Sequence, residues 1–235
     1  MIELRRTYER YWAARRADAG GAAEGSGSPN EIFESVGSVL GEGKRLLDVG
    51  CGVGTLLDLV GAKFQAVHGC DLSETALREA RQRGVLSVCA DLNRGLLPYQ
   101  DRSFECVTCL EVIEHVFDPL SLLRELRRVL KDDGQLVLTT PNIRYFRNVL
   151  TLVWHGRFPH TTMDTFVWGG GHLHYFTRTD LKLLLAEAGF TDCCFVANPE
   201  QFHRSWKRWL LAKLTGLDWF TEWICGGITV SARKK

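Results

Sequence analysis

The fold is decided at residues 46–55, which read LLDVGCGVGT. An apolar run leads directly into three glycines, and a helical pattern begins at Thr55. Glycines between a strand and a helix let the backbone approach a ligand closely, at the carboxyl edge of a parallel sheet. A glycine triplet alone is weak evidence, so its position between strand and helix carries the prediction.

Strand and helix patterns alternate on both sides of this stretch. Strands are predicted at 45–49, 66–70, 85–90, 104–110, 135–140, 190–196 and 227–232. Helices are predicted at 55–60, after the N-cap Ser73, at 122–130 and at 181–188, with a turn at 133–134. Strands separated by helices of this length give a doubly wound, Rossmann-like α/β fold, a parallel sheet with helices on both faces.

The composition is that of one globular enzyme-sized domain. The chain has 235 residues, of which 45% are hydrophobic and 24% charged, and its net charge of +1 gives no footprint for nucleic acid. We expect a single domain, 1–235. Its predicted parts are an N-terminal cap helix and linker (1–43), a cofactor-binding core (44–140), a substrate-side insertion (141–176), and a C-terminal helix and strands (177–235) that contain an insertion at 198–226.

The cysteines and the apolar runs bear on the compartment. Eight cysteines occur, several of them inside strand patterns where cysteine behaves as a small hydrophobe. The pair Cys106 and Cys109 lies within one strand pattern, so we favour core packing over a metal or redox site. No signal peptide is expected, and no run approaches the length of a membrane span. We therefore expect a reduced, cytoplasmic protein without disulfides.

Two aspartates follow the next two predicted strands. Asp71 ends the second strand, where a carboxylate can accept hydrogen bonds from both hydroxyls of a ribose. Asp91 ends the third, where it can accept one from the amine of adenine. Each aspartate can instead cap the helix that follows. We favour the ligand interpretation because three consecutive strands each end in a suitable group.

The glycine register separates two adenine cofactors. A nicotinamide enzyme needs Gly-x-Gly-x-x-Gly, but here the third-glycine position of that fingerprint holds Thr55. Asp48 also precedes the loop, where it would repel a pyrophosphate and suits a ligand that carries an ammonium and a sulfonium. These features favour S-adenosylmethionine over NAD.

Residues 45–140 resemble the class I S-adenosylmethionine-dependent methyltransferases, of the type 11 or 12-like kind. The resemblance is carried by 47–54, Asp71, 90–92, 101–107, 111–119 and 130–138. It implies a seven-stranded sheet whose last strand is antiparallel. It also implies a cofactor site made of Asp48, Gly50, Cys51, Gly52, Gly54, Thr55, Asp71, Leu72, Asp91, Leu92, Leu110 and Glu111.

Two further resemblances concern the acceptor side. Residues 141–142, 156–159 and 172–174 are similar to the MetW family, which implies the alternative of a cofactor-fold protein that serves a partner enzyme. The segment Glu111-x-x-Glu114-His115 resembles the one that binds a divalent metal in ubiquinone-biosynthesis O-methyltransferases. Small-RNA 2′-O-methyltransferases add a downstream histidine, so the implied ligands are Glu111, Glu114, His115 and His174, or His172 in place of His174.

A metal-free interpretation of this segment is favoured over the metal. In it the carboxylate caps a turn, and His115 lines the pocket or acts as a general base. An oxygen acceptor has a proton to lose, so the candidate catalytic residues are His115, His172 and His174.

Aromatic segments supply the predicted lid and acceptor pocket. The N-terminal helix with Tyr8 and Trp12 either folds over the cofactor or docks on the sheet edge. The insertion after the fifth strand places Arg144, Trp168 and Tyr175 on the acceptor side. The tryptophan-rich segment 198–226 either packs normally or makes a homodimer or peripheral membrane contact.

The sequence thus predicts methyl transfer from S-adenosylmethionine to a small-molecule acceptor, at an oxygen, with S-adenosylhomocysteine as the product. The alternatives are the MetW-like partner protein and an NAD-dependent oxidoreductase.

Overall fold

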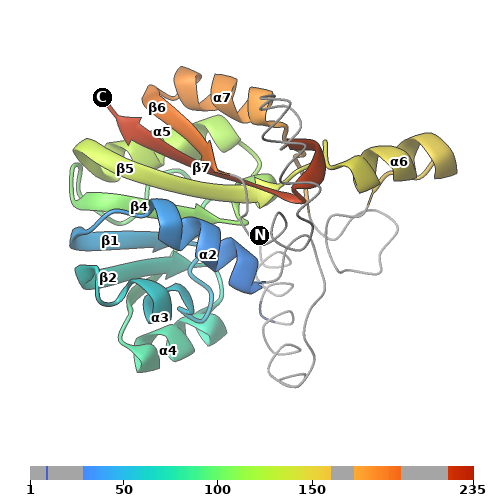
Figure 1. The fold of residues 1–235 in the computed structure, drawn as a ribbon. Helices are drawn as coiled ribbons and strands as arrows, with labels where there is room; N and C mark the ends of the chain where they lie inside the picture. Colours follow the sequence, from blue (N-terminus) through green and yellow to red (C-terminus); the bar gives the residue numbers. More distant parts are fainter. Residues whose placement is uncertain (1–8, 10–28, 160–171, 197–221) are drawn as a thin grey trace.

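The computed structural model describes residue 9 and residues 29–159, 172–196 and 222–235. Its centre is one seven-stranded sheet with the order β3-β2-β1-β4-β5-β7-β6 (Figure 1). Strands β1 to β5 run parallel, whereas β7 is antiparallel to both β5 and β6. The predicted sheet with an antiparallel last strand is confirmed. The strands are β1 (Gly43–Val49), β2 (Phe64–Asp71), β3 (Leu86–Cys89), β4 (Phe104–Leu110), β5 (Leu130–Pro141), β6 (Phe190–Val196) and β7 (Gly227–Lys234).

Helices cover both faces of the sheet because neighbouring strand residues point to opposite sides. Leu46 belongs to a buried cluster with residues of α2 and α3, and Leu47 to a second cluster with residues of α5 and α7. Figure 1 shows α2 and α3 on one face and α5 on the other. The helices are α2 (Pro29–Val39), α3 (Leu56–Val60), α4 (Glu74–Arg83), the short 3₁₀ helix η1 (Ile113–His115), α5 (Pro119–Val129), α6 (Phe146–His155) and α7 (Arg178–Glu187).

The predicted start of α4 is confirmed at the level of single hydrogen bonds. Ser73 is extended and its hydroxyl accepts a hydrogen bond from the N–H of Ala76, at 3.2 Å. This satisfies one of the donors that a helix N-terminus leaves free. The helix ends at Gly84, which has a φ of 103°, a backbone angle that residues other than glycine rarely adopt. Ser73 is therefore fixed at the end of β2, next to Asp71.

The prediction for the beginning of β5 was wrong. Leu130 was expected on the preceding helix and 133–134 in a turn, but Leu130 is already extended and pairs with Phe104 of β4. The register then shifts between Phe104 and Cys106, and Asp133 has a φ of 59°. The pairing passes from Leu130 to Gln135, so residues 131–134 form a bulge, and the bend predicted at 133–134 lies inside the strand instead of before it.

Two helices were not predicted by the sequence. Residues 29–39 fell within the expected linker but form α2, and residues 146–155 form α6 within the insertion. Cys106 and Cys109 belong to opposite buried clusters, which confirms core packing for that pair. None of the eight cysteines, all of which the structure describes, takes part in a disulfide. Among the described residues, no helix combines the length and apolarity that a bilayer crossing demands.

Candidate functional site

The glycine loop after β1 has a backbone that only glycine fits. Gly50 has a φ of 75°, and a Cβ placed on it would lie 2.2 Å from Cγ2 of Val112. Gly54 has a φ of 79°, and its Cβ would lie 2.9 Å from Cγ2 of Val85. Positive φ is costly for side-chain-bearing residues, and such distances are far inside van der Waals contact. The loop therefore brings bare backbone to the carboxyl edge of β1.

Asp48 lies within β1, just before this loop, and is almost fully buried. Its carboxylate accepts a hydrogen bond from the Thr108 hydroxyl of β4 at 2.7 Å. Burial raises the pKa of Asp48 to about 7, and the charge of Asp71 adds to the rise, while the Thr108 hydrogen bond opposes it. A buried carboxylate without a cation costs free energy, so a bound ammonium group would stabilise its charged form.

Asp71, at the end of β2, is held by two backbone donors. The N–H of Gly52 lies 3.0 Å from one carboxylate oxygen, and the N–H of Ser73 lies 2.8 Å from the other. Burial raises the pKa of Asp71, and these hydrogen bonds counteract the rise. A carboxylate offers about four lone-pair positions. The carboxylate of Asp71 is therefore held in place by the backbone and retains capacity to accept a hydrogen bond from a ligand.

Asp91 follows β3 at the next strand end. It accepts a hydrogen bond from the N–H of Asn93 at 3.0 Å and lies 3.4 Å from Nε of Arg94. Its side chain is 15% exposed, less buried than Asp48 or Asp71. The neighbouring hydrophobic residues Leu72 and Leu92 are half-buried. The three strand ends thus present a glycine loop, a bidentate carboxylate and a more open carboxylate in order along β1, β2 and β3.

The remaining predicted cofactor residues lie around these groups. Cys51 is buried in the glycine loop, and Thr55 precedes α3 as an exposed N-cap. Leu110 ends β4, and Glu111 follows it with a φ of 54°. The N–H of Glu111 donates to both the carbonyl and the hydroxyl of Thr139, each at 3.1 Å. A strained backbone locked at a strand end is typical of functional sites.

A second cluster lies beyond the end of β4 and joins three side chains. Glu114 is 1% exposed, and its Oε2 accepts a hydrogen bond from the hydroxyl of Thr140 at 3.0 Å. Its Oε1 accepts none from the residues that the structure describes. That oxygen lies 3.9 Å from Nε2 of His115 and 3.8 Å from Nε2 of His172. The two imidazole rings meet edge to face, with centroids 4.6 Å apart.

The backbone of Glu114 also draws the downstream histidines to the cluster. Its carbonyl accepts hydrogen bonds from the N–H groups of Leu173 at 2.8 Å and His174 at 3.1 Å. His172 therefore faces Glu114, whereas His174 stacks on Phe176, with ring centroids 6.0 Å apart. Of the two histidines that the sequence proposed, the structure brings His172 to Glu114 and His115.

The electrostatics of the cluster follow from burial. Burial raises the pKa of Glu114 well above its ordinary value, and the nearby Glu111 raises it further. Burial also raises the pKa of Glu111. Burial lowers the pKa of His172 to about 4, with a contribution from His115. His172 is therefore neutral near pH 7. A neutral imidazole has one ring nitrogen that can accept a proton or bind a metal.

The donor set fits a divalent metal. One carboxylate oxygen and two imidazole nitrogens, from Glu114, His115 and His172, lie within 4.8 Å of one another. Imidazole and carboxylate ligands suit several first-row divalent ions. The oxygen of Glu114 that accepts no hydrogen bond is the one that faces the imidazoles. Glu111 was also proposed as a ligand, but its side chain hydrogen-bonds Thr139 and lies outside this group.

An aromatic path connects the cluster to the insertion. The ring centroid of Tyr175 lies 6.2 Å from that of His172 and 4.7 Å from that of Phe158. Tyr175 therefore lies beside this cluster, and its role on the acceptor side stays a prediction. Arg144 instead pairs with the buried carboxylate of Glu222 at 2.8 Å, and lies over the ring of Trp223.

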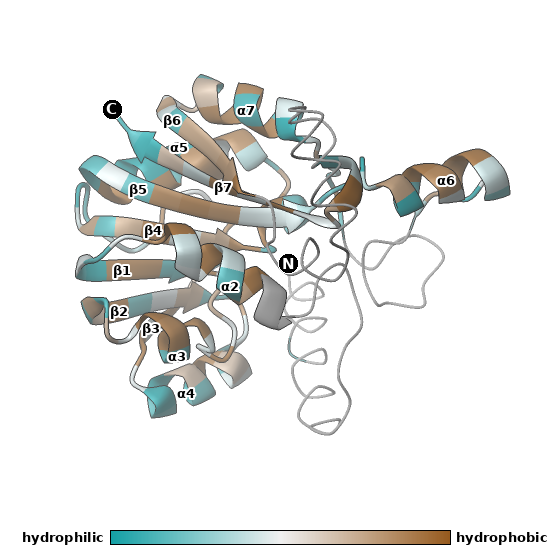
Figure 2. Ribbon diagram, viewed as in Figure 1, coloured by the Kyte–Doolittle hydropathy of each residue, from teal (hydrophilic) through white to brown (hydrophobic). Residues whose placement is uncertain are grey.

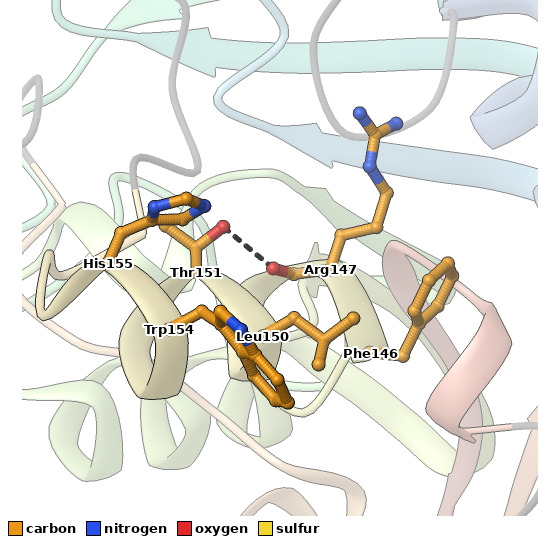
Figure 3. Close-up of a pocket in the computed structure, with 6 residues that line it drawn as sticks. All are labelled: Phe146, Arg147, Leu150, Thr151, Trp154 and His155. Carbon is orange, nitrogen blue, oxygen red and sulfur yellow. Dashed lines mark hydrogen bonds between the residues drawn. The ribbon is translucent and has the colours of Figure 1, made fainter.

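Helix α6 follows β5 and stands away from the sheet (Figure 1). Figure 2 shows that most residues of this helix are hydrophobic, and Trp154 is 76% exposed. An open hollow of about 590 Å³ runs along it (Figure 3). The hollow shares no residue with the strand ends that carry Gly50, Asp71 and Asp91, here called the cofactor edge. It also shares none with Glu114, His115 and His172, here called the histidine cluster. The residues that line it are Phe146, Arg147, Leu150, Thr151, Trp154 and His155.

Several contributors were missed by sequence reasoning. Thr108, Thr139 and Thr140 hydrogen-bond the site carboxylates or their backbone, but a threonine in a strand has no distinctive spacing. Glu222 lies near the start of β7 and was not singled out. Glu9 contacts the start of α4. The predicted residues Tyr8, Trp12 and Trp168 lie outside the described residues.

Comparison with known sequences identifies relatives of this chain. A family model described as a methyltransferase domain matches residues 5–194. The ubiquinone biosynthesis O-methyltransferase of Neisseria meningitidis serogroup A is 37% identical over 107 residues, which cover 43% of this chain and 45% of that relative. The chain therefore spans less than half the length of this curated relative.

Solved structures agree on the fold. A S-adenosylmethionine-dependent methyltransferase from Thermotoga maritima has a TM-score of 0.62 at 21% identity, covering 98% of this chain and 96% of its own. The [4+2]-cyclase SpnF has a TM-score of 0.66 at 23% identity, covering 98% and 95%. At such identities the likeness concerns architecture alone, and the same architecture serves a cyclase.

Proposed function

This chain belongs to the methyltransferase domain family, with the class I fold, and we propose that it transfers the methyl group of S-adenosylmethionine to an oxygen of a small-molecule acceptor. The observation that carries the proposal is the order of groups along three strand ends. The glycine loop, Asp71 and Asp91 follow β1, β2 and β3, where a doubly wound sheet binds its ligand.

Each group suits one part of this cofactor. The buried carboxylate of Asp48 is matched by the ammonium of the methionine moiety, and the loop at Gly50 leaves room for it. The free lone pairs of Asp71 accept the ribose hydroxyls, and Asp91 accepts the adenine amine. A pyrophosphate would meet the charge of Asp48 instead, so a nicotinamide cofactor is disfavoured.

Methyl transfer is a displacement in which positioning supplies most of the catalysis. The acceptor oxygen forms a bond to the methyl carbon, the carbon–sulfur bond breaks, and its electron pair stays on sulfur as S-adenosylhomocysteine. The hydroxyl proton passes to a base, and the proposed base is neutral His172 or its neighbour His115. Alignment of this kind is worth about 7–11 kcal/mol.

Binding measurements test this proposal directly. We expect calorimetry to detect S-adenosylhomocysteine binding and no NAD binding. Formation of S-adenosylhomocysteine should then be followed with phenol, carbohydrate and amine acceptors. Turnover with hydroxyl acceptors supports oxygen methylation, and turnover with amines alone contradicts it. Copurification of a partner enzyme, with no turnover on any acceptor, would favour the MetW-like alternative.

A divalent metal at Glu114, His115 and His172 is a second candidate feature, supported by the closeness of their ligand atoms. A metal ion there would polarise and acidify an acceptor hydroxyl. Titration with Mn²⁺ should show binding by the wild type and a loss of more than tenfold in affinity for His172→Ala. His155→Ala, on exposed α6, is the matched control and should bind as the wild type does. Equal binding by all three proteins contradicts the metal.

The remaining predictions concern the acceptor, the location and the binding partners. A small-molecule acceptor fits the family, and a cytoplasmic location stays a prediction from the sequence. A homodimer or a peripheral membrane contact through 198–226 is also retained, and most of that segment lies outside the described residues. Gel filtration and vesicle flotation of the whole chain test the two contacts separately.

A further inference from the structure

Glu9 reaches the cofactor edge from far away in the sequence. Its Oε2 accepts a hydrogen bond from the hydroxyl of Ser73 at 3.0 Å, across 64 positions of sequence. Its Oε1 accepts one from the N–H of Glu74, also at 3.0 Å. Thr75 adds hydrogen bonds from its side chain and its backbone. A single carboxylate thus occupies the first turn of α4, where helix donors are free and the dipole favours negative charge.

Ser73 connects this contact to the ribose carboxylate. While its hydroxyl donates to Glu9, its backbone N–H donates to Asp71 at 2.8 Å. The same hydroxyl accepts from the N–H of Ala76 and so caps α4. Ser73 is fully buried, which leaves it few alternative positions. A shift of Glu9 would therefore be felt by the donor that orients Asp71.

Charge alone predicts the opposite of a supporting role. The charge of Glu9 raises the pKa of Asp71, so it works against the ionised ribose carboxylate. If repulsion were the main effect of Glu9, its removal would leave cofactor affinity equal or better. If orientation through Ser73 is the main effect, removal weakens affinity. The two explanations therefore differ in sign.

We propose that Glu9 is a positioning residue for the cofactor: its carboxylate binds the first turn of α4 and thereby holds Ser73 and Asp71 in the geometry that binds the ribose. This inference rests on the proposed function, since it assumes an adenosyl ligand at Asp71. It makes the contact of Glu9 with α4 and the binding of the cofactor two linked equilibria, each of which strengthens the other.

The first measurement is the affinity for S-adenosylhomocysteine of the full-length chain. Glu9→Ala removes both measured hydrogen bonds and should weaken binding about tenfold, the scale of one or two hydrogen bonds to a charged group. Glu9→Gln retains an acceptor for the N–H of Glu74 and should weaken it less. Glu34→Ala, an exposed carboxylate of α2, is the matched control and should bind as the wild type does.

The second measurement separates positioning from general stability. The first 28 residues contain Arg5, Arg6, Arg10, Arg15 and Arg16, which trypsin can cleave. S-adenosylhomocysteine should slow cleavage at these sites in the wild type and in Glu34→Ala, and much less in Glu9→Ala. A residue that only stabilises the fold would not change this ligand-dependent protection.

The outcomes are distinct for the two proposals. Wild-type affinity in Glu9→Ala, or equal ligand protection of its N-terminal segment, overturns the role of Glu9 and leaves the proposed function intact. A wild type that binds no S-adenosylhomocysteine overturns both. Weaker binding together with lost protection in Glu9→Ala, and an intermediate result in Glu9→Gln, supports the role.

Discussion

The cofactor edge and the histidine cluster are built in different ways. The cofactor edge uses one continuous stretch, in which β1, β2 and β3 each end in a group that we propose as a cofactor ligand. The histidine cluster joins Glu114 and His115 to Thr140 near the end of β5 and to His172, which lies in the last part of the insertion. The first is encoded by local patterns, whereas the second depends on the tertiary fold.

The two regions also differ in how their buried charges are satisfied. Both oxygens of Asp71 accept backbone hydrogen bonds, so its position is set before a ligand arrives. Glu114 accepts one hydrogen bond at Oε2, and none at Oε1 from the described residues. A buried polar atom without a partner costs roughly 1–3 kcal/mol. We infer that the cofactor edge is preorganised, while the cluster gains stability when a proton, a metal or an acceptor supplies the missing contact.

The largest expected effect breaks the cofactor edge at its loop. Gly50→Ala places a Cβ 2.2 Å from Val112 Cγ2, on a backbone with a φ of 75°. Both the strain and the clash force the loop to move away from the ligand. We expect affinity for S-adenosylhomocysteine to fall more than about 100-fold, since a displaced loop also misplaces the Gly52 donor of Asp71. Calorimetry measures the change.

Gly156→Ala is the matched control for the loop variant. Gly156 has a φ of 59°, similar to that of Gly50, but a Cβ there would have no neighbour within 4 Å among the described residues. This variant carries backbone strain of about 1–2 kcal/mol without a clash. Its affinity for S-adenosylhomocysteine should match that of the wild type. Equal losses in the two variants would show that strain alone, and not the loop's fit, explains the result.

The second prediction removes the ribose carboxylate. Asp71→Ala deletes the acceptor of two backbone hydrogen bonds and of the proposed ribose hydroxyls. Affinity for S-adenosylhomocysteine should fall by roughly 1–3 kcal/mol, about fivefold to 150-fold. Asp132→Ala, an exposed aspartate in the first part of β5, is the control. Unchanged affinity in Asp71→Ala contradicts the ribose assignment.

Sequence patterns were sufficient to predict the positions of the glycine loop, Asp71 and Asp91, because each of these groups lies at the end of its own strand. Asp71 and Asp91 come directly after apolar runs, and strand β4 has the predicted bounds, Phe104–Leu110. Ser73 likewise caps α4 as predicted, because its side chain bonds a neighbour three residues away. Interactions of short range leave a mark in the local sequence.

Long-range interactions left no such mark. His172 and His174 were equivalent in the sequence, and only the hydrogen bonds from 173 and 174 to the Glu114 carbonyl distinguish them in space. Leu130 matched a helical spacing, yet pairing with Phe104 extends it into β5. Glu9 lies 64 positions from Ser73, so no local pattern could indicate the contact. Tertiary pairing overrode or supplemented propensity in each case.

The third prediction concerns the pH dependence of stability that the buried carboxylate of Asp48 gives to the cofactor edge. Burial raises the pKa of Asp48 from its ordinary 3.8 to about 7. As pH rises through this interval, the unfolded chain loses the proton first, so the cofactor-free protein loses stability. Asp48→Asn removes the titration. Its melting temperature should change less between pH 4 and pH 7 than that of the wild type.

The same variant should weaken cofactor binding. An amide cannot neutralise the ammonium of the ligand, so affinity for S-adenosylhomocysteine at pH 8 should fall about tenfold, while the cofactor-free melting temperature at that pH rises. Opposite signs for stability and affinity distinguish a functional carboxylate from a structural one. A variant that loses both would mean that Asp48 serves the fold through Thr108.

The smallest expected effect lies at α6, outside both of the regions compared. Trp154 is 76% exposed, and α6 contributes no buried residue to either core cluster. Trp154→Ala should therefore change the free energy of unfolding by less than about 0.5 kcal/mol, as exposed substitutions usually do. Affinity for S-adenosylhomocysteine should stay within twofold of the wild type, because α6 shares no residue with the cofactor edge. A large loss in the free energy of unfolding would instead mean that this face of α6 packs against another part of the chain and contributes to its stability.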